Sequence, residues 1–200
     1  SQDYKNTEIL LMDDGSSDNT FEILKNFEDS HKNIKAYQNK KNIGLTRSLN
    51  ILIQKTNGEI IARQDADDLS LDSRISSQLK YIENKNFDAC TTRAFVKDTK
   101  TLIPGFSYYL PHRLNMLYKN PFIHGTLMIK KKVIEKIGFY NEKFYFSQDL
   151  KLMRDLIDDK YKLGILNQPL YILNMKDNLS ESNKLEQKYF ANCARKRIDP

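Results

Sequence analysis

Cysteine is scarce in this chain of 200 residues, and long apolar runs are lacking. The two cysteines, Cys90 and Cys193, lie far apart without the short spacing of metal-ligand pairs, so we expect no disulfide framework. No apolar stretch approaches the roughly 18 to 20 residues of a membrane span, and the first residues are polar, unlike a secretion signal. These features favour a reducing, cytoplasmic setting.

Positive charge is in modest excess, with 32 basic and 26 acidic residues and a net charge of +6. The basic residues are scattered, and only two short stretches, around Lys40 and at Arg195–Arg197, are dense. Because no zinc finger, RNA-binding motif or basic heptad helix accompanies them, we expect no nucleic-acid partner. Arg195–Arg197 is either a solvated helix end or a weak peripheral contact with the inner face of an anionic membrane.

The first 68 residues alternate between strand patterns and helix patterns. Short apolar runs predict strands at 8–12, 34–37 and 59–64, and apolar residues at helical spacing predict a helix after each of them. This order predicts an α/β fold with a mainly parallel sheet flanked by helices. The later residues are less regular and predict strands at 87–96, near 128–129 and on both sides of Pro169, a loop at 104–111, and helices at 132–137 and after Asp149.

Two acidic clusters follow predicted strands at their carboxyl ends. Asp13 and Asp14 follow the first strand, and Asp65, Asp67 and Asp68 follow the third. The carboxyl ends of parallel strands meet at one rim of a sheet, where such sheets bind ligands. Like charges gathered at that rim need a cation or a hydrogen-bonding ligand to compensate them.

The pair Asp65 and Asp67 is the sharpest chemical signal in the sequence. Two carboxylates separated by one residue on a bending backbone can address a single ligand. Mg²⁺ is often bound by one or two carboxylates together with substrate phosphates. Residues 65–68 therefore predict a site for a divalent metal, and the alternative is an acidic loop in which Asp68 caps the next helix.

Five segments, taken in their order and spacing, resemble the family 2 glycosyltransferases with the GT-A fold: EILLMDDGSSDNT, NIGLTRSLN, GEIIARQDADD, HGTLMIKK and SQDLKLMRDL. The similarity covers nearly the whole chain. It implies an enzyme that moves a sugar from a nucleotide diphosphate donor to an acceptor hydroxyl with inversion at the anomeric carbon. The expected setting is the synthesis of a surface polysaccharide or glycolipid.

The resemblance also implies roles for the acidic motifs. Asp14, with Gly15 and Ser16 beside it, would bind the nucleotide base, and its carboxylate favours UDP because it can accept the uracil N3–H. Asp65 would bind the ribose. Asp67, together with Asp65, would hold Mn²⁺ or Mg²⁺ on the diphosphate.

Further roles fall on the second half of the chain. Asp149 matches the catalytic base of the family, although its local sequence also predicts a plain helix N-cap. Gln148 replaces the usual Glu before that base, which leaves the hydrogen bonding on the acceptor side open. His124 and Arg154 are candidates for the acceptor side or are structural, and Arg47 lies near the diphosphate or on the surface.

The resemblance divides the chain into a nucleotide-sugar-binding half at 1–86, an acceptor-binding half of the same domain at 87–175, and a basic helical tail at 176–200. The partners would be a UDP-sugar and a saccharide or lipid-linked acceptor. Two alternatives stay open: a non-catalytic relative that binds nucleotides or glycans, and a Mg²⁺-dependent phosphotransferase.

Members of this family usually begin with an apolar strand that lies beside the strand at 8–12, and the given sequence starts after it. We therefore expect either a fragment of a longer enzyme or another segment or subunit that fills the place. A gap should then separate the strands at 8–12 and 59–64, leaving backbone groups unpaired. A fragment of this kind should bind UDP weakly and turn over poorly.

Overall fold

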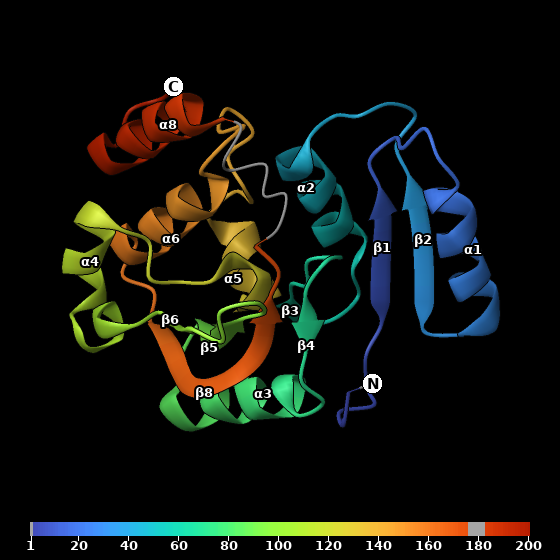
Figure 1. Cartoon of the computed structure of the whole chain (residues 1–200), viewed down its shortest axis with the longest axis horizontal. Helices are drawn as coiled ribbons and strands as arrows, with labels where there is room; N and C mark the ends of the chain where they lie inside the picture. Colours follow the sequence, from blue (N-terminus) through green and yellow to red (C-terminus); the bar gives the residue numbers. More distant parts are fainter. Residues whose placement is uncertain (1, 176–182) are drawn as a thin grey trace.

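The computed structural model describes residues 2–175 and 183–200, whose strands form two sheets (Figure 1). The smaller sheet is β1 (Ile9–Asp13) paired in parallel with β2 (Ile34–Gln38). The larger sheet has the order β3-β7-β5-β8-β4, with β6 beside β5. Its strands are β3 (Ile60–Ala62), β4 (Leu69–Ser70), β5 (Ala89–Val96), β6 (Leu102–Ile103), β7 (Met128–Lys130) and β8 (Leu163–Leu173).

The larger sheet is mixed, which corrects the prediction of a mainly parallel sheet. β5 and β8 run parallel, whereas the pairs β3–β7, β5–β7, β4–β8 and β5–β6 are antiparallel. The first three strands were expected in one sheet, but β3 pairs with β7 from the second half of the chain. The alternation of strand and helix patterns predicts the order of the elements along the chain. It does not predict which strands pair when they are distant in sequence.

Helices cover both faces of the larger sheet. The main core lies between the sheet and α4 (His112–Tyr118), α5 (Lys131–Lys136), α6 (Gln148–Asp158) and α8 (Lys184–Lys196), and its fully buried members include Met153, Leu156 and Phe144. α3 (Arg74–Lys85) packs on the other face over a small cluster that contains Cys90. Cys90 and Cys193 are both buried free thiols.

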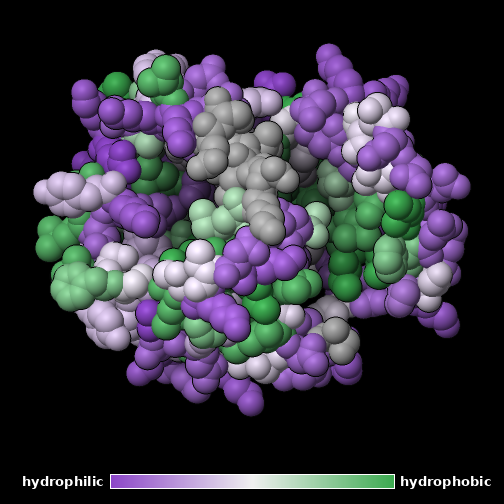
Figure 2. All heavy atoms as spheres, viewed as in Figure 1, coloured by the Kyte–Doolittle hydropathy of each residue, from purple (hydrophilic) through white to green (hydrophobic). Residues whose placement is uncertain are grey.

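The smaller sheet carries α1 (Thr20–Ser30) and borders α2 (Leu45–Lys55). Within the described residues β1 pairs with β2 and β3 pairs with β7, so a gap separates β1 from β3, as expected from the sequence. Figure 2 shows apolar residues gathered over this half of the molecule, where Ile9, Ile23 and Phe27 are exposed.

Several local expectations need correction. The segment expected as a loop at 104–111 contains the 3-10 helix η1 (Phe106–Tyr109), and α4 was not predicted. β8 runs through Pro169 as one strand, with a shift in its register against β5. α8 lies within the predicted helical tail, of which 176–182 fall outside the described residues. Among the described helices, none is both long and apolar enough to cross a membrane.

Glu8 links the start of β1 to the turn that leads into β3. Its Oε1 accepts hydrogen bonds from the Thr56 hydroxyl at 2.6 Å and from the Gly58 backbone N–H at 2.9 Å. The hydrogen bond from Thr56 and those from the backbone outweigh the effect of burial and lower the pKa of Glu8 below its ordinary value of 4.5. A carboxylate thus replaces strand pairing across part of the gap.

We predict that Glu8→Gln lowers the free energy of unfolding by about 1 kcal/mol at pH 7, because the hydrogen bonds lose their charged acceptor. Since the folded-state pKa is lowered, this contribution is present above pH 4.5 and disappears as the pH falls through the folded-state value. Urea unfolding of both proteins between pH 3 and 7 measures the difference. Glu59→Gln, at an exposed neighbour, is the matched control. Equal stability of wild type and Glu8→Gln at pH 7 would remove this role.

Candidate functional site

The turn after β1 is built around Asp13, which is 2% exposed. Its carboxylate accepts the Ser16 backbone N–H at 2.9 Å and the Gln38 side-chain amide at 2.9 Å. Burial raises the pKa of Asp13, but these hydrogen bonds outweigh it and lower the pKa. Gly15 has a φ of 77°, and a Cβ there would lie 2.5 Å from the carbonyl carbon of Lys41. This position therefore requires glycine.

Asp14 binds the amino end of α2. Its carboxylate accepts the Asn39 side-chain amide at 2.8 Å and the backbone N–H groups of Ile43 at 3.0 Å and Gly44 at 2.9 Å. The Ser48 hydroxyl is a fourth donor to this carboxylate, so its roughly four acceptor positions all have protein partners. Burial opposes ionisation of Asp14, but the hydrogen bonds lower its pKa overall and keep it charged.

The carboxylates after β3 separate into different environments. Asp65 forms a bidentate ion pair with Arg63, whose Nη1 lies 2.7 Å from Oδ2 and whose Nη2 binds Oδ1. Asp67 is exposed and accepts no hydrogen bond from the described residues. Asp68 is buried and accepts the Asn174 backbone N–H at 2.7 Å, so it does not cap the following helix. Burial is the main reason that the pKa of Asp68 is raised.

The 3-10 helix η2 (His124–Thr126) lies directly against Asp65. A Cβ on Gly125 would lie 2.8 Å from the Asp65 carboxylate, which explains the glycine between His124 and Thr126. The His124 Nε2 lies 2.7 Å from the Tyr140 hydroxyl. Burial, with a further contribution from the positive charge of Arg63, lowers the pKa of His124 well below its ordinary value. His124 is therefore a neutral ring that contacts Tyr140.

Asp149 is the second residue of α6, and Ser147 takes the N-cap position that the sequence allowed for Asp149. Its Oδ2 accepts a hydrogen bond from the Asn120 side-chain amide at 2.8 Å. Asn120 is itself fixed, because its Oδ1 accepts the Phe122 backbone N–H at 3.0 Å. Asn120 thus orients the carboxylate, a role that no feature of the sequence indicated.

The pKa of the Tyr140 hydroxyl is affected by charged residues of both the Asp65 motif and the Asp149 motif. Burial is the main cause of its raised pKa, which Arg63 opposes and which Asp149 and Asp65 increase. The candidate base and the first carboxylate of the Asp-x-Asp pair therefore act on one buried hydroxyl. Direct contacts join the Asp65 motif, η2 and Tyr140, because Gly125 approaches Asp65 and His124 contacts Tyr140.

α2 holds the segment that leads to Asp149. Asn50 donates from Nδ2 to the Tyr140 carbonyl at 2.9 Å, and its Oδ1 accepts the Tyr140 backbone N–H at 3.0 Å. The Thr46 hydroxyl donates to the Phe144 carbonyl at 3.0 Å. The same helix begins at the N–H groups bound by Asp14, so one rigid element connects the two halves of the site.

Three remaining candidates lie away from these contacts or at their edge. Arg47 is exposed and pairs with Glu142 at 3.4 Å. Gln148 is the half-buried first residue of α6. Arg154, a candidate for the acceptor side or for a structural role, donates from Nη2 to the Arg195 carbonyl at 3.5 Å. Five residues separate it from Asp149, so it projects about 140° away around the helix.

Comparisons with known proteins agree on one family. Residues 1–138 match the family described as Glycosyl transferase family 2. The chain is 31% identical over 180 residues to the putative glycosyltransferase EpsE of Bacillus subtilis, with 86% of this chain and 63% of EpsE covered. It is 28% identical over 201 residues to the O-antigen biosynthesis glycosyltransferase WbnJ of Escherichia coli, with 97% and 77% covered. The chain spans less than two thirds of EpsE and of the next curated relative (63% and 65%).

Solved structures show the same fold at low sequence identity. Staphylococcus aureus TarS 1–349 in complex with UDP-GlcNAc matches with a TM-score of 0.75 and 16% identity, covering 90% of this chain and 54% of that one. The mannosyltransferase PcManGT of Pyrobaculum calidifontis, in complex with GDP-Man and Mn²⁺, matches with a TM-score of 0.72 and 18% identity, covering 100% and 59%. These matches establish the α/β architecture of GT-A glycosyltransferases for the chain.

We predict that Asn50→Ala lowers the free energy of unfolding by about 2–3 kcal/mol, because the buried N–H and C=O groups of Tyr140 lose their partners. Gln54 lies one turn after Asn50, near the end of α2, and is exposed, so Gln54→Ala should change the free energy of unfolding by less than about 0.5 kcal/mol. Chemical denaturation of the two variants and the wild type measures both effects. A cost for Asn50→Ala no larger than that of Gln54→Ala would contradict a clamp at this position.

Proposed function

Because the chain belongs to glycosyl transferase family 2, we propose that it carries the reaction centre of an inverting glycosyltransferase that moves a sugar from a UDP-sugar to an acceptor hydroxyl. The observation that carries this proposal is the Asp149 carboxylate held by Asn120 at the start of α6, with the exposed Asp67 two residues from the Asp65–Arg63 ion pair. One group of carboxylates faces the donor phosphates, and another carboxylate faces the acceptor.

Asp149 acts as the general base. The acceptor hydroxyl gives its proton to the Asp149 carboxylate while the acceptor oxygen forms a bond to the anomeric carbon. The bond from that carbon to the diphosphate oxygen breaks, and the nucleoside diphosphate leaves with the electron pair. Asn120 holds Oδ2 of Asp149 and directs Oδ1 to the acceptor.

Selectivity for uracil rests on Asp14. Its charged carboxylate accepts N–H groups, and the N3–H of uracil would bind there in place of the Ser48 hydroxyl, which is free to rotate to another partner. Among the structural relatives, TarS binds UDP-GlcNAc and PcManGT binds GDP-Man, so the fold accommodates either base. Gly15 and Ser16 shape the turn that presents this carboxylate, and the exposed Arg47 on the first turn of α2 can approach the diphosphate.

The residues fit a divalent metal that shares its ligands with the substrate. No group of three or more His, Cys, Asp or Glu side chains gathers in the described residues, so a metal here needs the diphosphate oxygens as well. Asp67 is the better ligand, since Arg63 already neutralises Asp65. When bound, Mn²⁺ or Mg²⁺ offsets negative charge on the leaving diphosphate, and the relative PcManGT contains Mn²⁺.

The acceptor and the cellular setting follow less directly. WbnJ acts in O-antigen biosynthesis, which supports a saccharide or lipid-linked acceptor for this chain too. Gln148 directly precedes Asp149 on α6 and His124 contacts Tyr140, and both are candidates for contacts with the acceptor. In the basic tail, Arg195 donates to the Tyr118 carbonyl and Arg197 pairs with Asp158, so a membrane contact by these charges must compete with their internal bonds.

We predict that Asp149→Asn reduces sugar transfer by at least about 100-fold and leaves UDP affinity nearly unchanged, because a base acts on the acceptor. Initial transfer rates and calorimetric titration with UDP measure the two effects. Asp159→Asn, at the far end of the same helix, is the matched control and should keep the wild-type rate. A non-catalytic binding relative would bind UDP but show no transfer in the wild type, and a phosphotransferase would move phosphate instead of sugar.

A second prediction concerns the metal: Mn²⁺ tightens UDP binding at least about tenfold over the affinity in EDTA, and Asp67→Asn removes most of that gain. Calorimetry with UDP, with and without Mn²⁺, provides a readout that does not depend on turnover. Asp29→Asn, an exposed carboxylate on α1, should behave as the wild type. Equal UDP affinity in Mn²⁺ and in EDTA would rule out the metal at Asp67.

A further inference from the structure

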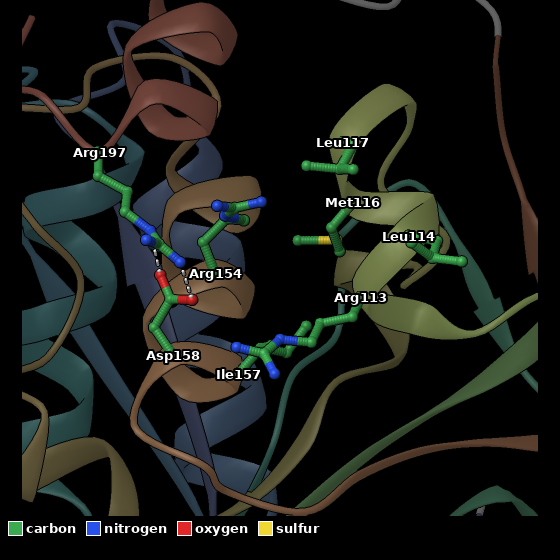
Figure 3. A pocket seen from close by; sticks show the side chains of 8 residues that line it. All are labelled: Arg113, Leu114, Met116, Leu117, Arg154, Ile157, Asp158 and Arg197. Atoms are coloured by element: carbon green, nitrogen blue, oxygen red, sulfur yellow. Dashed lines mark hydrogen bonds and ion pairs between the residues drawn. The ribbon is translucent and has the colours of Figure 1, made fainter.

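A pocket of about 230 Å³ lies between α4 and α6, with the end of α8 at its side (Figure 3). Its lining combines apolar and charged side chains. The apolar residues come from both helices, and the charged ones include three arginines: Leu114, Met116, Leu117, Ile157, Arg113, Arg154, Arg197 and Asp158. This composition suits a ligand with an apolar part and a negative charge.

Arg154 is the most informative residue of the pocket. It is 8% exposed, and its Nε is buried without a hydrogen-bond partner in the described residues. Its one described side-chain hydrogen bond is the long contact of 3.5 Å with the Arg195 carbonyl. Figure 3 shows the side chain on α6, pointing toward α4. A buried guanidinium needs an anionic partner to offset its desolvation, and no described carboxylate supplies one here.

The charges of the pocket leave a positive excess. Arg197 forms an ion pair with Asp158, with Nη2–Oδ1 at 2.6 Å and Nε–Oδ2 at 2.9 Å, so these two charges compensate each other. Arg113 reaches from α4 toward α6 and forms no hydrogen bond with the described residues. Arg113 and Arg154 together match the charge of a phosphate monoester, about −1.5 to −2 at neutral pH. Guanidinium groups also fit phosphate oxygens in their bidentate geometry.

The apolar side of the pocket continues onto the surface of α4. Met116 is buried, whereas Leu114 and Leu117 are 57% and 49% exposed. An apolar substituent of a bound phosphate could therefore extend from the pocket along α4. We propose that this pocket binds a phosphate group carried on an apolar chain, at a site separate from the one around Asp149.

Binding of hexyl phosphate to the 200-residue chain, measured by calorimetry, tests this site. Inorganic phosphate and hexanol each carry half of the ligand and should bind at least about tenfold more weakly. Arg113→Gln and Arg154→Gln should each weaken hexyl phosphate about tenfold or more, because each removes a charge-assisted contact. Lys132→Gln, an exposed lysine on α5, is the matched control and should have no effect.

Because Arg154 is buried, binding to Arg154→Gln is measured at a temperature at which its thermal unfolding curve shows a folded protein. Arg113 is exposed, so Arg113→Gln tests the same site without that control. Sedimentation with vesicles that contain phosphatidic acid, a lipid with a phosphate monoester, then distinguishes the source of the phosphate. If the protein sediments with the vesicles and Arg113→Gln reduces this, the ligand is a membrane lipid. If the protein binds hexyl phosphate but does not sediment with the vesicles, the ligand is a free phosphorylated amphiphile. Undetectable hexyl phosphate binding, or equal binding to the wild type and Arg113→Gln, would overturn the proposal.

Discussion

The paired hydrogen bonds between Asn50 and the Tyr140 backbone are the constraint on which the site depends. They join α2, whose amino end is bound by Asp14, to the segment that leads into Asp149. Unpaired N–H and C=O groups in a buried segment cost about 1–3 kcal/mol each, so the segment has one favourable position against α2. β1 and β3 belong to separate sheets, so strand pairing does not join the two halves of the molecule there. Side-chain hydrogen bonds of Glu8 and Asn50 connect them instead.

The carboxylates differ in the charges and hydrogen-bond donors around them. Arg63 lies buried behind the Asp-x-Asp pair and neutralises Asp65, while Asp67 is exposed and accepts no hydrogen bond from the part of the chain that the structure describes. The same positive charge helps to keep His124 neutral, so the ring can contact Tyr140 without adding charge beside the carboxylates. This difference supports the roles that we propose, with Asp67 as the metal ligand and Asp149 as the base.

The sequence predicted the elements with local patterns and missed the pairings between distant ones. The helices that became α1, α2, α3 and α6 follow from apolar spacing, and the turns after β1 and β3 follow from their aspartates. The mixed sheet does not, because β7 and β8 insert between segments far apart in the chain. Arg63 offered a usable signal, as a charged residue directly after the apolar residues Ile60–Ala62 of β3.

Asn120 gave no such signal, because its role comes from proximity to Asp149 in the fold. Arg154 shows the opposite case. Its position near Asp149 in the sequence suggested a shared site, but the rotation of the helix turns it into a different pocket. Helical periodicity alone could have predicted that separation.

The reaction that we propose for this protein breaks the bond between a sugar and a nucleoside diphosphate. Release of nucleoside diphosphate from a panel of UDP-, GDP- and CDP-sugars, in the presence of Mn²⁺ and a saccharide acceptor mixture, tests this most directly. The assigned roles of Asp14 and Asp149 predict release from at least one UDP-sugar, faster than from the GDP- or CDP-linked form of the same sugar. No release from any donor, or faster release from GDP- or CDP-sugars, would contradict them.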